Sequence, residues 1–160
     1  MTSLQKALSS VSLEPLEIAL EAKDQLNNAE PDFYEFRLDR MLEYLWVWED
    51  PWGVGFCSEE IGKGDSQESK PFSGSTLFPQ PAWHAGRIRY LMANPEVFEF
   101  PIEVDCECSG GHVLPMPVIL DGWHRYFGHL WLGRDTIRAT FGGLVDVREY
   151  LQGLIDVRPE

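Results

Sequence analysis

Hydrophobic positions in the second half of the chain follow the spacing of strands and helices in turn. Alternating apolar residues predict strands at residues 98–106 and 136–141, and a short apolar run predicts another at 117–120. Helical spacing predicts helices over residues 84–94, 123–132 and 145–154. Ser109-Gly110-Gly111 predicts the turn of a hairpin that leads into residues 112–114.

The first half shows weaker patterns. Ser12 precedes a helical pattern that carries Leu13, Leu16 and Leu20, and residues 33–38 alternate like a short strand. Asp39 is expected to cap a helix that runs to about Trp46, and residues 58–80 are rich in Gly, Ser, Lys and Glu. We therefore expect an acidic, helical N-terminal segment (1–57) packed on the domain, a flexible loop (58–80) and a core (81–160).

The net charge of the chain bears on which partners are expected. The chain has 26 acidic and 13 basic side chains, and its net charge is -13. Non-specific nucleic-acid binding relies on Lys and Arg, so nucleic acid is an unexpected partner. The acidic first half either binds a basic protein partner or keeps the chain soluble.

Other features of the composition favour a cytoplasmic protein. We expect no membrane span and no secretory leader, because no apolar run is long enough for either. The 3 cysteines do not form a disulfide framework and are expected to be reduced.

A strand-to-helix turn carries the candidate chemistry. Asp121 and Gly122 follow the apolar strand, and Trp123-His124-Arg125 opens the next helix. A helix start attracts anions, and two cations in its first turn are unfavourable by about 0.3–1 kcal/mol each unless an anion is bound. Gly122 permits close approach of a ligand, and Asp121 can cap the helix or orient His124. The alternative is a capped helix with two exposed basic residues.

The turn resembles the central element of the ParB/sulfiredoxin-like superfamily. The matching segments are Val118-Ile119-Leu120-Asp121-Gly122-Trp123-His124-Arg125-Tyr126 and Trp131-Leu132-Gly133-Arg134-Asp135-Thr136-Ile137-Arg138, and the resemblance covers about residues 84–143. It implies an α+β fold, with a small mixed sheet packed with helices. It also implies that Gly122, His124 and Arg125 bind nucleotide phosphates and that Asp121 supports them.

The resemblance has limits that bear on activity. Sulfiredoxins carry a reactive Cys where this chain has Trp123, so sulfiredoxin activity is not expected. Partition proteins continue into a basic helix-turn-helix that we do not find. Glu103, with His124 and Asp121, is a candidate catalytic residue, either as general base or as a ligand of Mg²⁺ bound with ATP or CTP.

Several other residues have alternative interpretations. Cys106 and Cys108, with His112, form part of a zinc site or, more simply, are small core residues on one side of a strand. His84 is expected at the surface, unless the fold brings it to the phosphate site. Arg134 and Arg138 are candidates for an extended basic surface. The tryptophans Trp46, Trp48, Trp52 and Trp83 are either core residues or interface residues.

Three hypotheses of function follow. The first is a phosphate- or nucleotide-binding domain, with nucleotide hydrolysis or phosphoryl transfer as candidate reactions and no resident metal. The second is an acidic inhibitor or interaction protein on a degenerate ParB-like fold, which binds its partner through the Trp-rich first half. The third is a nuclease, which the charge balance disfavours.

Overall fold

The computed structural model describes residues 33–45, 49–68 and 80–160. The strands are β1 (Tyr34–Arg37), β2 (Ile102–Ser109), β3 (His112–Asp121) and β4 (Thr136–Phe141). The helices are α3 (Leu38–Leu45), α4 (Pro81–Met92), α5 (Pro95–Phe98), α6 (Trp123–Trp131) and α7 (Val145–Gln152), with a 3-10 helix η2 (Ser58–Gly62). The α+β fold class is therefore confirmed. The helix expected near Leu13 lies outside the described residues.

The strands form one mixed four-stranded sheet in the order β1-β4-β2-β3. β1 pairs antiparallel with β4, and β2 pairs antiparallel with β3. β2 and β4 are parallel. The predicted division of the chain differs here, because β1 lies in the segment assigned to the N-terminal extension yet pairs with a strand of the core.

One face of the sheet is buried and the other is open. Tyr34 pairs with Ala139, and Ile102 also pairs with Ala139, so their side chains share a face. The buried residues of that face are Tyr34, Phe36, Ile137, Ala139, Ile102, Val104, Cys106 and Ile119. The alternate positions are exposed polar residues: Glu35, Arg37, Thr136, Arg138, Thr140 and Glu103. This alternation is typical of a sheet with one solvated face.

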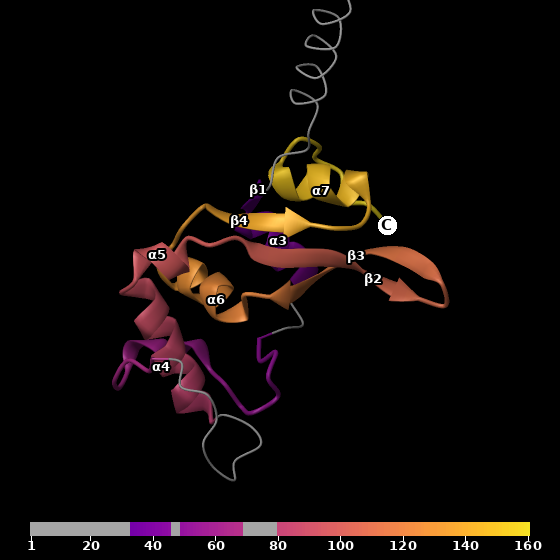
Figure 1. Cartoon of the computed structure of the whole chain (residues 1–160). Helices are drawn as coiled ribbons and strands as arrows, with labels where there is room; N and C mark the ends of the chain where they lie inside the picture. Colours follow the sequence, from indigo (N-terminus) through magenta and orange to yellow (C-terminus); the bar gives the residue numbers. More distant parts are fainter. Residues whose placement is uncertain (1–32, 46–48, 69–79) are drawn as a thin grey trace, which may run out of the picture. The chain divides into compact units, whose positions relative to one another are not determined.

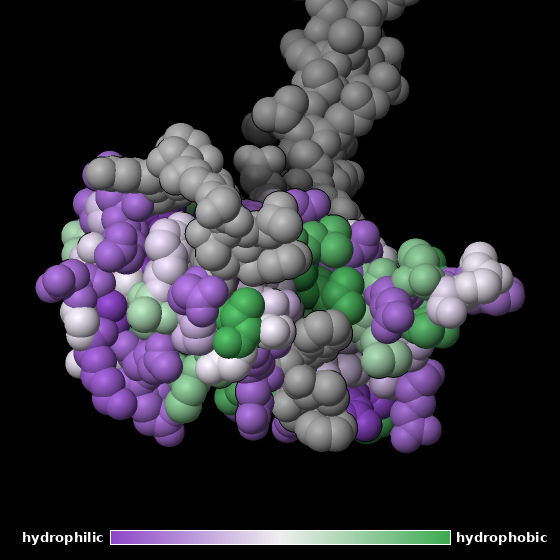
Figure 2. Space-filling view, turned by 90° about the horizontal axis from the view of Figure 1, so that it is seen from below, coloured by the Kyte–Doolittle hydropathy of each residue, from purple (hydrophilic) through white to green (hydrophobic). Residues whose placement is uncertain are grey.

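The helices form two groups, one of α7 with α3 and one of α6 with α4 and α5 (Figure 1). Ile88 of α4, Phe127 of α6 and Val147 of α7 are buried in the same hydrophobic core as the sheet. None of the described helices is long and apolar enough to cross a membrane. Over the described residues, the face in Figure 2 is mostly hydrophilic, with small separate hydrophobic groups.

The β2–β3 hairpin extends away from the helices (Figure 1) and separates two cysteines that we expected on one side. The register shifts between Cys106 and Cys108, so the simple alternation is interrupted. Cys106 is buried against Gly143, whereas Cys108 is exposed. The interpretation of both cysteines as core residues is therefore wrong for Cys108.

Residues 58–68, which we expected to be part of a flexible loop, are anchored on α4. The guanidinium of Arg89 donates to the carbonyl oxygens of Glu60, Ile61 and Asp65 at 2.7–3.2 Å. Gln67 N–H donates to the carbonyl of Gly86 at 2.9 Å. The composition of residues 58–68 did not indicate this anchoring, because the side chain that binds their backbone carbonyls, Arg89, is distant in sequence.

Candidate functional site

The turn from β3 to α6 has the backbone that the sequence predicts, but Asp121 does not cap the helix, which was one of its two expected roles. Gly122 is the N-cap residue, with φ 103° and ψ 17°, and no side chain caps the helix. Asp121 instead accepts a hydrogen bond from Arg125 Nη2 at 2.6 Å. The carboxylate of Asp121 is therefore engaged by a side chain of α6 rather than by the first-turn amides of that helix.

Gly122 is required by both its conformation and its packing. A Cβ atom at this position would lie 2.5 Å from Cγ2 of Ile102, a core residue of β2. We therefore expect Gly122→Ala to reduce the free energy of unfolding by about 2 kcal/mol. Denaturant unfolding measures this loss.

Gly133→Ala is the matched control for that substitution. Gly133 also has positive φ (63°), but a Cβ there meets no atom within 4 Å. The control is expected to reduce stability by about 1 kcal/mol, from backbone conformation alone. Equal losses in the two variants would contradict the packing argument at Gly122.

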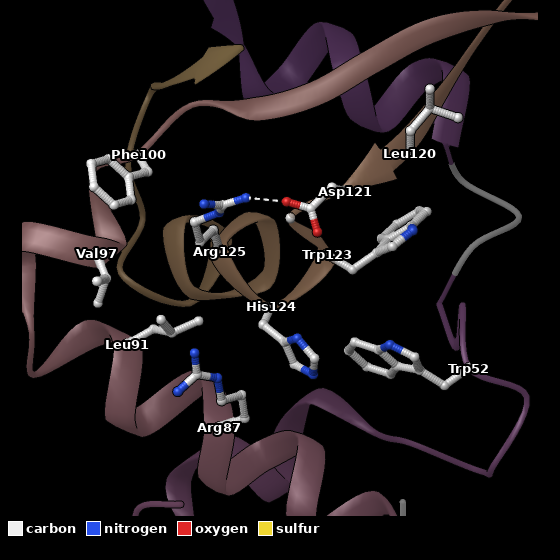
Figure 3. Close-up of a pocket in the computed structure, with 11 residues that line it drawn as sticks. Trp52, Arg87, Leu91, Val97, Phe100, Leu120, Asp121, Trp123, His124 and Arg125 are labelled. Atoms are coloured by element: carbon white, nitrogen blue, oxygen red, sulfur yellow. Dashed lines mark hydrogen bonds and ion pairs between the residues drawn. The ribbon is translucent and has the colours of Figure 1, made fainter. Parts of the chain in front are cut away.

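A cavity of about 410 Å³ opens beside the first turn of α6. Its polar lining comes from Arg87 of α4 and from Asp121, His124 and Arg125 (Figure 3). Apolar side chains form its walls: Trp52, Leu91, Val97, Phe100, Leu120 and Trp123. The volume and the apolar walls with few polar groups are typical of small-molecule sites.

The two guanidinium groups of the cavity differ in their partners. Arg125 is held by the carboxylate of Asp121, which largely neutralises it. Arg87 lies over the ring of Tyr90, with 5.1 Å from Cζ to the ring centroid, and has no ion pair with any residue of the described ranges. Figure 3 shows its guanidinium directed into the cavity. Arg87, rather than Arg125, is therefore the cation available to a ligand.

His124 belongs to a stack of aromatic rings. Its Nε2 lies 2.9 Å from Nδ1 of His84, and the two imidazoles are nearly parallel, at 15°. The indole of Trp52 stacks on both rings, with centroid distances of 3.9 Å to His84 and 4.7 Å to His124. His84 is buried, with 2% exposure. The expectation that His84 lies at the surface is wrong, and the alternative that it joins the site agrees with the geometry.

This environment keeps His124 neutral. Burial, followed by the neighbouring His84, Arg87 and Arg125, lowers the pKa of His124 to about 3. The sequence predicts two cations, His124 and Arg125, in the first turn of α6. Since the imidazole is uncharged near pH 7, His124 is a hydrogen-bonding group in the empty cavity, not a cation.

The remaining candidates lie outside the cavity. Glu103 is the register partner of Asp121 on β2 and is exposed, but it does not line the cavity. Arg138 pairs with Glu35 at 3.2 Å, and Arg134 lies 3.8 Å from Glu99, so neither extends a free basic surface. In the described part of the chain, no group of three potential metal ligands occurs.

The buried face of α6 includes a polar residue. Tyr126, Phe127 and His129 are buried, whereas Trp131 is 46% exposed. His129 Nδ1 bonds to the carbonyl of Arg125 at 2.9 Å, and its ring stacks on Phe98. Because this hydrogen bond gives the imidazole a partner, a polar residue can occupy a core position.

Trp52 and Arg87 are parts of the site that the sequence did not assign, and His84 was assigned to it only as an alternative. They lie about 35 to 70 residues before His124, and no local pattern links them to it. The Trp-rich composition was the available signal. Trp52 and Trp83 both pack on the imidazoles, and the core interpretation holds for Trp52, which is partly buried against the hydrophobic core. Trp46 and Trp48 lie outside the described residues.

The fold and the cavity define a mixed α+β domain with a site lined by arginine and aromatic side chains. Comparison with protein-family models, with curated proteins and with solved structures finds no match for the chain.

Proposed function

We propose that this chain is a phosphate-binding domain of the ParB/sulfiredoxin-like type, which binds a nucleotide or another organic phosphate in the cavity beside α6. The observation that carries the proposal is the Arg87 guanidinium, which enters the cavity and has no carboxylate partner among the described residues. It faces the first turn of α6, and a helix start favours an anion.

The walls of the cavity support an organic phosphate rather than a bare ion. Phe100 and Leu120 are each 57% exposed, and both line the cavity with Trp52 and Trp123. These surfaces can pack on the base or another apolar part of a ligand while Arg87 binds its phosphate.

The geometry supports binding more directly than catalysis. A base with a pKa of about 3 is poorly matched to proton abstraction near pH 7. Asp121 is engaged by Arg125, and Glu103 lies outside the cavity. Mg²⁺ would have to be bound by these two carboxylates together with ligand phosphates, as is common for this ion.

Isothermal titration of the full chain with ATP, CTP and phenyl phosphate, each with and without Mg²⁺, tests the proposal. Saturable binding of at least one of these ligands is expected. Phosphate release in the same mixtures measures hydrolysis separately. The absence of heat with every ligand would overturn the proposal.

An acidic interaction protein is the second candidate, favoured by the net charge of -13 and by the open polar face of the sheet. Trp52 and Trp83 do not support it, because they pack on His84. Pull-down from the native cell tests it. Nucleotide turnover without a recovered partner counts against it.

A further inference from the structure

The His84–His124 contact places a proton-binding pair beside the cavity. Nδ1 of His84 and Nε2 of His124 lie 2.9 Å apart. One hydrogen lies between them, because two facing lone pairs at this distance would repel. One ring therefore donates and the other accepts. Nδ1 of His124 makes no hydrogen bond within the described residues, and the ring lies between Arg87 and Trp52 (Figure 3).

The charged groups around His124 set the cost of adding a proton. α4 contributes His84 and Arg87, α6 contributes Arg125, and Asp121 faces Arg125 from the end of β3. From the segment before η2, the indole of Trp52 stacks on His124. Two guanidinium groups and one carboxylate together disfavour the imidazolium, in agreement with the low pKa of His124.

A bound anion reverses this balance. One negative charge about 4 Å away, at an effective dielectric constant near 20, favours a protonated imidazole by about a thousandfold. A dianion raises the pKa of His124 from its low value about twice as far as a monoanion at the same distance does. A dianion therefore favours the charged pair near neutral pH much more strongly than a monoanion.

We infer that the His84–His124 pair takes up one proton when a dianion binds, and that the cavity consequently selects phosphomonoesters over phosphodiesters. The inference rests on the proposed phosphate binding. A phosphomonoester carries close to two negative charges at pH 7.5, whereas a phosphodiester carries one. The proton comes from solvent, no covalent bond to carbon or phosphorus changes, and His124 Nδ1–H donates to a phosphate oxygen.

Titration calorimetry with phenyl phosphate at pH 7.5, in two buffers of different protonation enthalpy, counts the protons. We expect uptake of nearly one proton by the wild-type chain and almost none by His124→Gln. His112→Gln is the matched control, because His112 is exposed at the start of β3, and should behave as wild type. Methyl phenyl phosphate, the diester, should bind at least about tenfold more weakly than phenyl phosphate.

The outcomes separate this inference from the proposed function. Binding of phenyl phosphate without proton uptake, or equal affinity for the diester, overturns the inference and leaves phosphate binding intact. Failure of both esters to bind overturns both. If His124→Gln does not fold, two measurements on the wild-type chain still test the inference. These are the number of protons taken up and the ratio of its affinities for the monoester and the diester.

Discussion

Arg87→Ala is expected to weaken the binding of phenyl phosphate by about a hundredfold, because it removes the only cavity cation without a carboxylate partner in the described residues. A hydrogen bond to a charged group contributes about 1.5–3 kcal/mol, and each 1.4 kcal/mol corresponds to a tenfold change in affinity. Stability should change little, since Arg87 is only partly buried and has no ion pair with any described residue. Titration calorimetry and denaturant unfolding measure the two quantities.

Arg134→Ala is the control for general charge effects. It removes the same charge from a residue that is outside the cavity and close to Glu99. Its affinity should stay within about twofold of wild type, because distant surface charges are screened by salt. Equal losses in the two variants would show that overall charge, not the cavity, governs binding.

Acid is expected to destabilise the ligand-free chain through His124. The pKa of this imidazole is about 3 in the folded chain, against 6.5 as its ordinary value. Between these values the unfolded chain binds one more proton than the folded chain, so stability falls as the pH falls from 6.5 toward 3. One such proton lowers the free energy of unfolding by at most about 1.4 kcal/mol per pH unit. Because the ring is partly exposed, we expect the free energy of unfolding to fall by about 2 kcal/mol between pH 6.5 and 4.

Unfolding by urea at pH 7, 5.5 and 4 measures this dependence in wild type, His124→Gln and His112→Gln. The His124→Gln chain should lose about 2 kcal/mol less over this range than the other two. Carboxylates titrate in all three chains, so the difference isolates the imidazole. Parallel curves for wild type and His124→Gln would contradict a neutral, buried His124.

Local signals in the sequence predicted the central element well. The apolar run before Asp121, the glycine at 122 and the helical spacing after it are all within about 15 residues, and the structure places β3, Gly122 and α6 there. Long-range features were not predictable in this way. His84 and His124 are 40 residues apart, and their contact depends on how α4 packs on α6. Asp121 was expected to cap α6 or to orient His124, but an arginine one turn later binds its carboxylate.

Because β1 pairs with β4, the sheet can form only late in the synthesis of the chain. Glu35 and Arg138 are 103 residues apart yet lie side by side in the sheet. Closing a loop of this length is entropically costly and slows strand pairing. A nascent chain therefore cannot complete its sheet until β4 has left the ribosome. A fragment that begins after residue 80 would expose the edge of β4, which invites association between chains.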